Sequence, residues 1–254
     1  MDMIVTENLT KVFAMPDGSD KRAVNGLSCT VKRGHVYGLL GPNGAGKTTT
    51  LRLLSGLMAP TAGRAMVAGH DVSADPDAAK RVIGFLTANT GLYHRLSARE
   101  FLAYFAELHQ INGRAATARV AHLIDWLDMG SFADLRCGTL STGQRQRVNI
   151  ARALVGDPPV LIMDEPTLGL DVLSNRVILD FIRRERDEGK TVLLCTHYLD
   201  EAESMCDRIG LLHNGKLVAE GTLEELRAQV GQERLSTIFL KVVGAETPGA
   251  EGSR

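Results

Sequence analysis

A glycine-rich segment that ends in a lysine and a threonine carries the clearest chemistry in the sequence. Residues 41–48, here called the phosphate loop, fit the pattern G-x-x-x-x-G-K-[ST]. Glycines at this spacing let backbone N–H groups converge on phosphate oxygens, and a helix that starts here adds the positive end of its dipole. We expect Lys47 to reach the β- and γ-phosphates of a nucleoside triphosphate, and the Thr48 hydroxyl to ligate Mg²⁺. The expected nucleotide contacts are Gly41, Pro42, Asn43, Gly44, Ala45, Gly46, Lys47, Thr48 and Thr49.

Two adjacent carboxylates, Asp164 and Glu165, follow a short apolar run. Asp164 is suited to hold Mg²⁺, and Glu165 to orient and activate an attacking water. The structural alternative is an acidic pair that caps a helix, because Pro166 follows at once. The phosphate loop upstream favours the catalytic interpretation. His197 follows another apolar run and is expected to contact the γ-phosphate, although a lone histidine is more often structural.

A second anion site is predicted at residues 140–147, here called the signature segment, which read Leu-Ser-Thr-Gly-Gln-Arg-Gln-Arg. A Ser-x-Gly turn there precedes a helix-like stretch that continues to Leu154. The N-terminus of such a helix presents backbone N–H groups and a positive dipole end, so it can bind phosphate independently of the first loop.

The elements that must position these residues are short apolar runs. Residues 36–40, 160–163 and 191–196 lead into the phosphate loop, the two carboxylates and His197 respectively. Continuous apolar runs of this length, separated by helical patterns, predict strands buried on both faces of a mostly parallel sheet. Ligands of such sheets bind at the carboxyl ends of the strands, where all three features fall. The expected class is α/β.

Other segments differ from this pattern. Residues 1–31 and 63–69 alternate like an antiparallel edge, and Asn214-Gly215 lies between two apolar runs as in a hairpin. The stretch of about 92–154 is expected to be an inserted helical subdomain, opened by a capping box at Ser97 and Glu100. Its stripe from Phe101 to Leu108 is interpreted as core.

These motifs, in this order and spacing from about Asn8 to Glu224, resemble the nucleotide-binding subunit of an ABC transporter, most closely NatA-type sodium and multidrug exporter ATPases. The resemblance implies a P-loop NTPase core, with an ABC ATP-binding domain over residues 1–226 and a C-terminal extension over 227–254. The end of that extension, 244–254, is expected to be disordered because it is small, polar and contains a proline. It also implies an ATPase that uses ATP and Mg²⁺, with Glu165 and His197 as catalytic residues and with Thr48 and Asp164 at the metal.

The resemblance further implies a homodimer around two MgATP, in which each signature segment completes the site of the other protomer. The residues concerned are Ser141, Thr142, Gly143 and Gln144, with Asp171 in a loop at the dimer contact. An integral membrane permease would be the other partner, and sodium or drug efflux the function. The alternatives are a soluble ABC ATPase acting on a nucleic-acid or ribosomal partner, and an ATP-binding regulator.

At three places in the sequence, the role of the residues that match the family pattern has more than one interpretation. The glutamine that usually precedes the helical subdomain is replaced by Ala88, and Asn89 beside it could serve as its substitute. Phe13 falls where the family stacks an aromatic ring on adenine, or else it is a core phenylalanine. Leu92 and Tyr93 either face the permease or fold into the helical subdomain.

The composition of the chain excludes several classes of protein. The chain has 254 residues and a net charge of −1, so it lacks the excess of basic residues that is typical of a nucleic-acid-binding protein. No nucleic acid is therefore expected as a partner. Its four cysteines lie far apart in sequence, which indicates free thiols rather than disulfides or a zinc site. No targeting or membrane-spanning segment is evident. We expect a cytoplasmic protein that is peripheral on the cytoplasmic face of the cell membrane through its partner.

Overall fold

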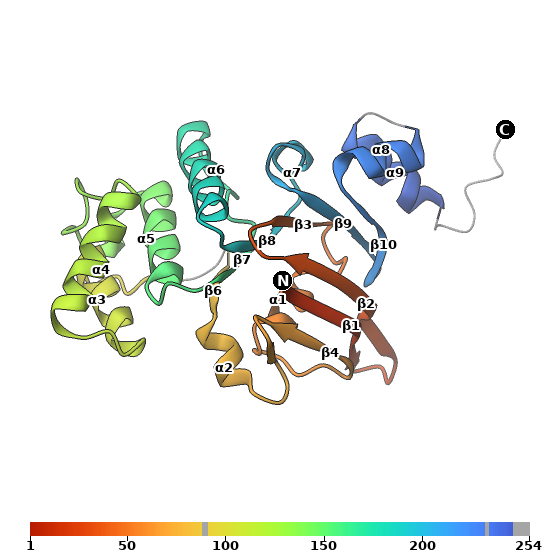
Figure 1. Cartoon of the computed structure of the whole chain (residues 1–254), viewed down its shortest axis with the longest axis horizontal. Helices are drawn as coiled ribbons and strands as arrows, with labels where there is room; N and C mark the ends of the chain where they lie inside the picture. The colour runs from red at the N-terminus through yellow and green to blue at the C-terminus, as the bar shows by residue number, and fades with distance from the viewer. Residues whose placement is uncertain (88–90, 232–233, 246–254) are drawn as a thin grey trace.

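The computed structural model describes residues 1–87, 91–231 and 234–245. Its strands form two sheets (Figure 1). The six-stranded sheet has the order β10-β9-β3-β8-β7-β6, with bounds Lys216–Gly221, Arg208–His213, Val36–Leu40, Thr191–Thr196, Val160–Asp164 and Ile83–Leu86. The four-stranded sheet has the order β2-β1-β4-β5, with bounds Asp20–Lys32, Asp2–Ala14, Ala62–Val67 and His70–Asp71.

The six-stranded sheet confirms the parallel core. Strands β6, β7, β8, β3 and β9 pair in parallel, and every residue of β3, β7 and β8 is buried. Helices cover one face of this sheet and the four-stranded sheet packs over the other, so both faces of these strands need apolar side chains. The predicted hairpin at Asn214-Gly215 is also present, since β10 pairs antiparallel with β9 and forms the antiparallel edge.

The N-terminal strands do not lie at the edge of that sheet, as their alternation had suggested, but form an antiparallel sheet of their own. Strands β1 and β2 each run for 13 residues and pair through several register shifts. One face of this sheet packs on α1 (Lys47–Leu54) and the main sheet, in a core that joins Ile4 and Leu27 to Leu51 and Ile162. The antiparallel sheet and α1 thus share one core with the main sheet.

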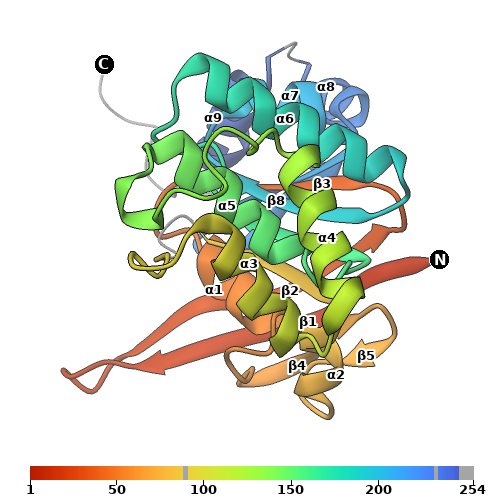
Figure 2. The same cartoon turned by 90° about the vertical axis from the view of Figure 1, so that its left-hand side faces the viewer.

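The helices of residues 98–154 gather at one end of the molecule (left in Figure 1) and face the viewer in Figure 2. They are α3 (Ala98–Leu108), α4 (Gly113–Trp126), a 3₁₀ turn (Cys137–Thr139) and α5 (Thr142–Leu154). The capping box is confirmed: the Ser97 hydroxyl accepts from the Glu100 N–H, and the Glu100 carboxylate accepts from the Ser97 N–H.

The aromatic stripe of α3 is only partly core. Phe101 and Leu102 are buried, but Tyr104 is 41% and Leu108 59% exposed. The interpretation of the whole stripe as core was wrong because α4 and α5 cover only one side of the helix. Leu92 is buried in the same cluster, whereas Tyr93 is 53% exposed and rests edge-on against Phe101.

The remaining helices complete the molecule. Helices α2 (Pro76–Arg81), α6 (Val172–Asp187) and α7 (Leu199–Met205) connect strands, and α8 (Leu223–Val230) and α9 (Leu235–Ala245) follow β10. The expected start of the C-terminal extension, residue 227, lies within α8, where Leu226 is buried against α9 and the β9 side of the sheet. The tail expected to be disordered was 244–254, but Gly244 and Ala245 lie at the end of α9, and 246–254 lie outside the described residues.

Two further predictions from the sequence concern the cysteines and membrane-spanning segments. All four cysteines are free thiols, as predicted. No helix within the described ranges is both long and apolar enough to cross a membrane.

Candidate active site

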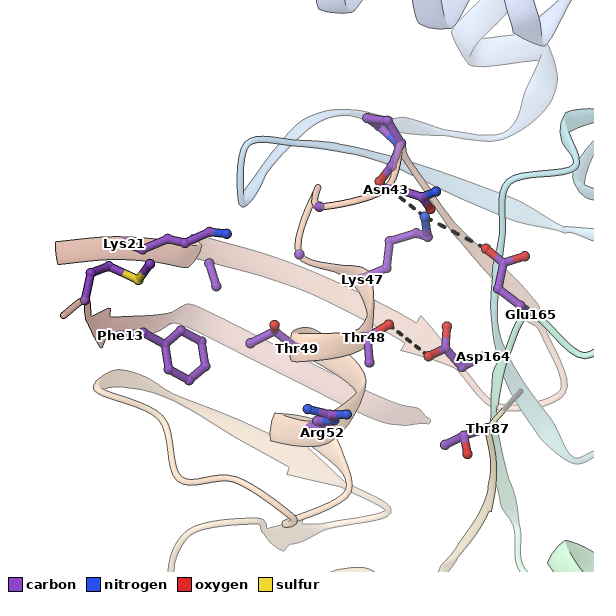
Figure 3. Close-up of a pocket in the computed structure, with 15 residues that line it drawn as sticks. Phe13, Lys21, Asn43, Lys47, Thr48, Thr49, Arg52, Thr87, Asp164 and Glu165 are labelled. Carbon is purple, nitrogen blue, oxygen red and sulfur yellow. Dashed lines mark hydrogen bonds and ion pairs between the residues drawn. The ribbon is translucent and has the colours of Figure 1, made fainter. Parts of the chain in front are cut away.

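A cavity of about 540 Å³ opens at the carboxyl ends of β3 and β7, around the phosphate loop (Figure 3). Residues from four separate parts of the chain converge on it. The cavity is lined by Phe13, Met15, Lys21, Ala23, Pro42, Asn43, Gly44, Gly46, Lys47, Thr48, Thr49, Arg52, Thr87, Asp164 and Glu165.

The phosphate loop needs its last glycine for two reasons. Gly46 has φ +109°, a left-handed conformation that side chains disfavour, and it forms the N-cap of α1. A Cβ at Gly46 would also collide with the backbone carbonyl of Ala23. The loop therefore packs backbone against backbone, which leaves its N–H groups at the start of α1.

Lys47 is held over the loop. Only 6% exposed, it donates from Nζ to the carbonyl oxygens of Gly41 at 2.5 Å and Pro42 at 3.3 Å. Its Nζ also lies 3.9 Å from Oε1 of Glu165. A buried ammonium in this place fits a polyanionic ligand.

Thr48 and Asp164 form an adjacent pair of oxygen ligands. The Thr48 hydroxyl donates to Oδ2 of Asp164 at 2.9 Å, and Asp164 is 8% exposed. A hydroxyl and a carboxylate suit Mg²⁺, which binds proteins through one or two such groups and takes its other ligands from phosphates and water. Within the described ranges, no three His, Cys, Asp or Glu side chains gather in a metal-binding arrangement. A metal bound by this pair would take further ligands from the nucleotide phosphates and water.

Burial is the main cause that raises the pKa of Asp164 above its ordinary value, and the bond from Thr48 partly opposes it. The folded chain therefore holds this proton more tightly than the unfolded chain, so ionisation of Asp164 destabilises the fold as the pH rises through the raised pKa. We expect Asp164→Asn to raise the Tm at neutral pH, by roughly 2–4 °C for a gain of about 1 kcal/mol.

The difference should shrink towards about pH 4, where the carboxyl is increasingly protonated in both states. Thermal unfolding of the wild type and of the Asp164→Asn chain at the two pH values checks this. A lower Tm of the Asp164→Asn chain at neutral pH would contradict it.

Glu165 adopts a strained backbone that turns its side chain back into the site. Its φ is +50°, a left-handed value that is costly for a residue with a side chain. Its N–H donates to the carbonyl of Cys195 at 2.8 Å, which ties the turn to β8. Its carboxylate, 12% exposed, lies 2.8 Å from Nδ1 of His197 and accepts from the His197 N–H at 3.3 Å. The structure thus brings Glu165, His197 and Lys47 together.

The signature segment does not reach this cavity. Ser141 is the N-cap of α5 and forms a reciprocal capping box with Gln144. Thr142 lies in the first turn of that helix. None of residues 141–144, all of which are described, lines the cavity. Asp171 caps α6 instead, where it accepts from the N–H and the hydroxyl of Ser174, each at 2.9 Å.

Gly143 allows α5 and α6 to approach closely. A Cβ there would lie 3.1 Å from the Cβ of Ser174 and would collide with its hydroxyl, which is already bonded to Asp171. We expect Gly143→Ala to destabilise the fold by about 1–2 kcal/mol through overpacking. Thermal unfolding measures the loss, which should be smaller in a Ser174→Ala background. Equal stability of the wild type and Gly143→Ala would exclude this contact.

The cavity lining includes Phe13, which was predicted, and five residues that the sequence did not predict: Met15, Lys21, Ala23, Arg52 and Thr87. Phe13 is half-buried and lines the cavity wall, so it is not an ordinary core phenylalanine. Lys21 lies directly opposite it on β2. Arg52 follows Thr48 by one helical turn, so the spacing alone could have placed it on the same face. Thr87 also lines the cavity, but the expected Asn89, with Ala88, lies outside the described residues.

Comparison with known proteins decides the family. The ABC transporter family matches residues 24–168, a stretch that contains the phosphate loop, the signature segment and both carboxylates. The chain belongs to the ABC transporter family. The chain is an ATPase.

Relatives of this ABC chain include a resistance protein and a transporter ATP-binding protein. The daunorubicin resistance ATP-binding protein DrrA3 of Streptomyces coeruleorubidus is 42% identical over 87% of this chain and 70% of its own length. The ABC transporter ATP-binding protein NatA of Bacillus subtilis is 40% identical over 86% of this chain and 89% of its own.

Solved structures confirm the ABC fold. The ATP-binding subunit of an ABC transporter matches 94% of this chain and 99% of its own with a TM-score of 0.85 and 28% identity. A dimeric ATP-binding cassette in a post-hydrolysis state with ADP and Pi matches 87% of this chain and 98% of its own with a TM-score of 0.78 and 27% identity.

Proposed function

We propose that this chain is the ATP-hydrolysing subunit of an ABC exporter, in which two copies close around two MgATP to drive a separate membrane permease. The observation that carries the proposal is the separation of the signature segment from the chain's own cavity. A capped helix N-terminus that can bind phosphate, yet does not line the phosphate-loop cavity of its own chain, is suited to the cavity of a second copy.

The cavity residues have distinct roles in this proposal. The phosphate loop and Lys47 bind the triphosphate, and Phe13 stacks on the base. Thr48 and Asp164 hold Mg²⁺, which neutralises charge that develops on the phosphates. Glu165 accepts a proton from the attacking water, and His197, whose ring nitrogen lies 2.8 Å from Glu165, orients that carboxylate and contacts the γ-phosphate.

The second copy completes each site. Ser141 and Gly143 of one protomer reach the γ-phosphate bound at Lys47 of the other, and Asp171 lies at the contact. Both copies thus share the γ-phosphate, so the bound triphosphate stabilises the dimer. Hydrolysis removes the shared group and lets the dimer open, which would move the permease between conformations. The dimeric cassette structures support this arrangement.

Export is supported by the names of the relatives, which include drug resistance proteins and a Nod factor export protein. Sodium ions or a drug-like molecule are the cargo that we infer from the likeness to NatA and DrrA3. The exposed Tyr93, backed by Phe101 and Tyr104, offers an apolar face to the permease. The subunit would then lie on the cytoplasmic face of the membrane.

A pull-down of the tagged chain from detergent-solubilised membranes, followed by mass spectrometry, tests this function. We expect a stoichiometric protein with several membrane spans to co-purify, and its sequence would narrow the cargo. A soluble homodimer with ATPase activity and no membrane partner would favour a cytosolic ABC ATPase. Absence of phosphate release would favour an ATP-binding regulator.

A further inference from the structure

The segment 166–170 joins Glu165 to Asp171. It is hydrogen-bonded to the carboxylate of Glu201 on α7. Thr167 is 2% exposed, and its hydroxyl donates to Oε2 of Glu201 at 2.9 Å. The side-chain amide of Asn175 on α6 donates to Oε1 of the same carboxylate at 2.8 Å. Both oxygens of Glu201 are therefore used, and they join the segment to two helices.

The same segment is also hydrogen-bonded to α5, the helix that begins within the signature segment. Gln146 lies one turn into α5, and its Nε2 donates to the carbonyl oxygen of Pro166 at 2.6 Å. Pro166 directly follows Glu165. The helix that presents the signature segment is thus bonded to the residue next to the catalytic carboxylate of its own chain.

These contacts explain how the strained turn at Glu165 persists. A non-glycine residue at φ +50° is stable only where the surrounding structure fixes it. On one side, the Glu165 N–H bonds to Cys195, and on the other, the Leu168 N–H bonds back to the Glu165 carbonyl at 3.2 Å. Glu201 and Gln146 hold the next residues in place, and α7, which carries Glu201, begins two residues after His197.

We propose that Glu201 and Gln146 are positioning residues for hydrolysis, which fix segment 166–170 and thereby the carboxylate of Glu165 relative to His197 and to the signature helix. Neither is among the described residues that line the cavity, so neither contacts nucleotide in its own site. The proposal rests on the proposed role of Glu165. In this proposal, the two side chains affect the rate of the chemical step and not the affinity for ATP.

The first test compares two substitutions of Glu201 in the full chain. Glu201→Leu removes both bonds, and we expect kcat for ATP to fall about 10- to 100-fold, as for other misplaced catalytic groups. The KM for ATP should stay within about twofold, because the lost interaction acts on the transition state. Glu201→Gln should restore most of kcat, since its amide can accept from Asn175 and donate to the Thr167 hydroxyl.

Asp200→Asn is the matched control on the same helix, because Asp200 is exposed and does not line the cavity. It should leave kcat and KM unchanged. Gln146→Met keeps the length of the side chain but removes its bond to Pro166, and it should lower kcat at constant KM. This variant decides the matter if Glu201→Leu does not fold.

The outcomes separate the two proposals. Wild-type kcat in the folded Glu201→Leu and Gln146→Met chains would overturn the positioning role while leaving the ATPase intact. A rise in KM that matches the loss of kcat/KM would overturn it too, because it would show a binding role. A wild-type chain without phosphate release would instead refute the proposed function.

Discussion

Replacement of Glu165 by glutamine is expected to lower ATP turnover by about 10²- to 10⁴-fold while ATP still binds, which is the range for loss of a general base. Glutamine has nearly the same shape, but it cannot accept the proton of the attacking water. Lys47 and the phosphate loop are unchanged, so the triphosphate should remain bound and hold two copies together. Phosphate release measures the turnover, and size-exclusion chromatography with MgATP measures the dimer.

Glu188→Gln provides the control for this variant. Glu188 is exposed at the C-cap of α6 and is not among the residues that line the cavity. It should hydrolyse ATP at the wild-type rate and show no additional dimer. Wild-type turnover in the Glu165→Gln chain would remove Glu165 from the role of base, and a monomer that binds ATP without dimerising would contradict the shared site.

Replacement of Lys47 by alanine is expected to weaken ATP binding about 10- to 100-fold, the equivalent of about 1.5–3 kcal/mol for a charge-assisted bond. The reason is the position of its buried ammonium, which is held over the phosphate loop by two carbonyl oxygens and has no substitute nearby on the loop. Isothermal titration with MgATP measures the affinity.

Lys216→Ala is the matched control, because Lys216 is exposed on β10 and does not line the cavity. It should bind ATP like the wild type. Unaltered affinity of the Lys47→Ala chain would count against the assignment of the phosphate loop. If both variants lost affinity equally, a general charge effect would explain the result better than a specific site.

The features that depend on neighbours in sequence were predictable. The parallel strands could be read from nearly continuous apolar runs, since strands buried on both faces need them, and every residue of β3, β7 and β8 is indeed buried. The hairpin at Asn214-Gly215 and the capping box at Ser97 and Glu100 depend on a few adjacent residues. The phosphate loop follows from the spacing of its glycines and Lys47.

Features that depend on what lies across the fold were not predictable. The register shifts of β1 and β2, and the separate sheet that these strands form over α1, could not be read from their local alternation. The exposure of Tyr104 and Leu108 depends on how far α4 and α5 extend around α3. Met15 and Lys21 are cavity residues because β2 lies against the phosphate loop, where the backbone of Ala23 abuts Gly46.

The sequence by itself determined which chemical groups the chain carries and at which strand ends they lie, because local spacing and burial patterns encode both. Only the tertiary structure decided that Glu165 and His197, 32 residues apart, meet at 2.8 Å, and that the signature segment lies away from the chain's own cavity. Distances between elements arise from the packing of many side chains at once. No short stretch of sequence contains that information.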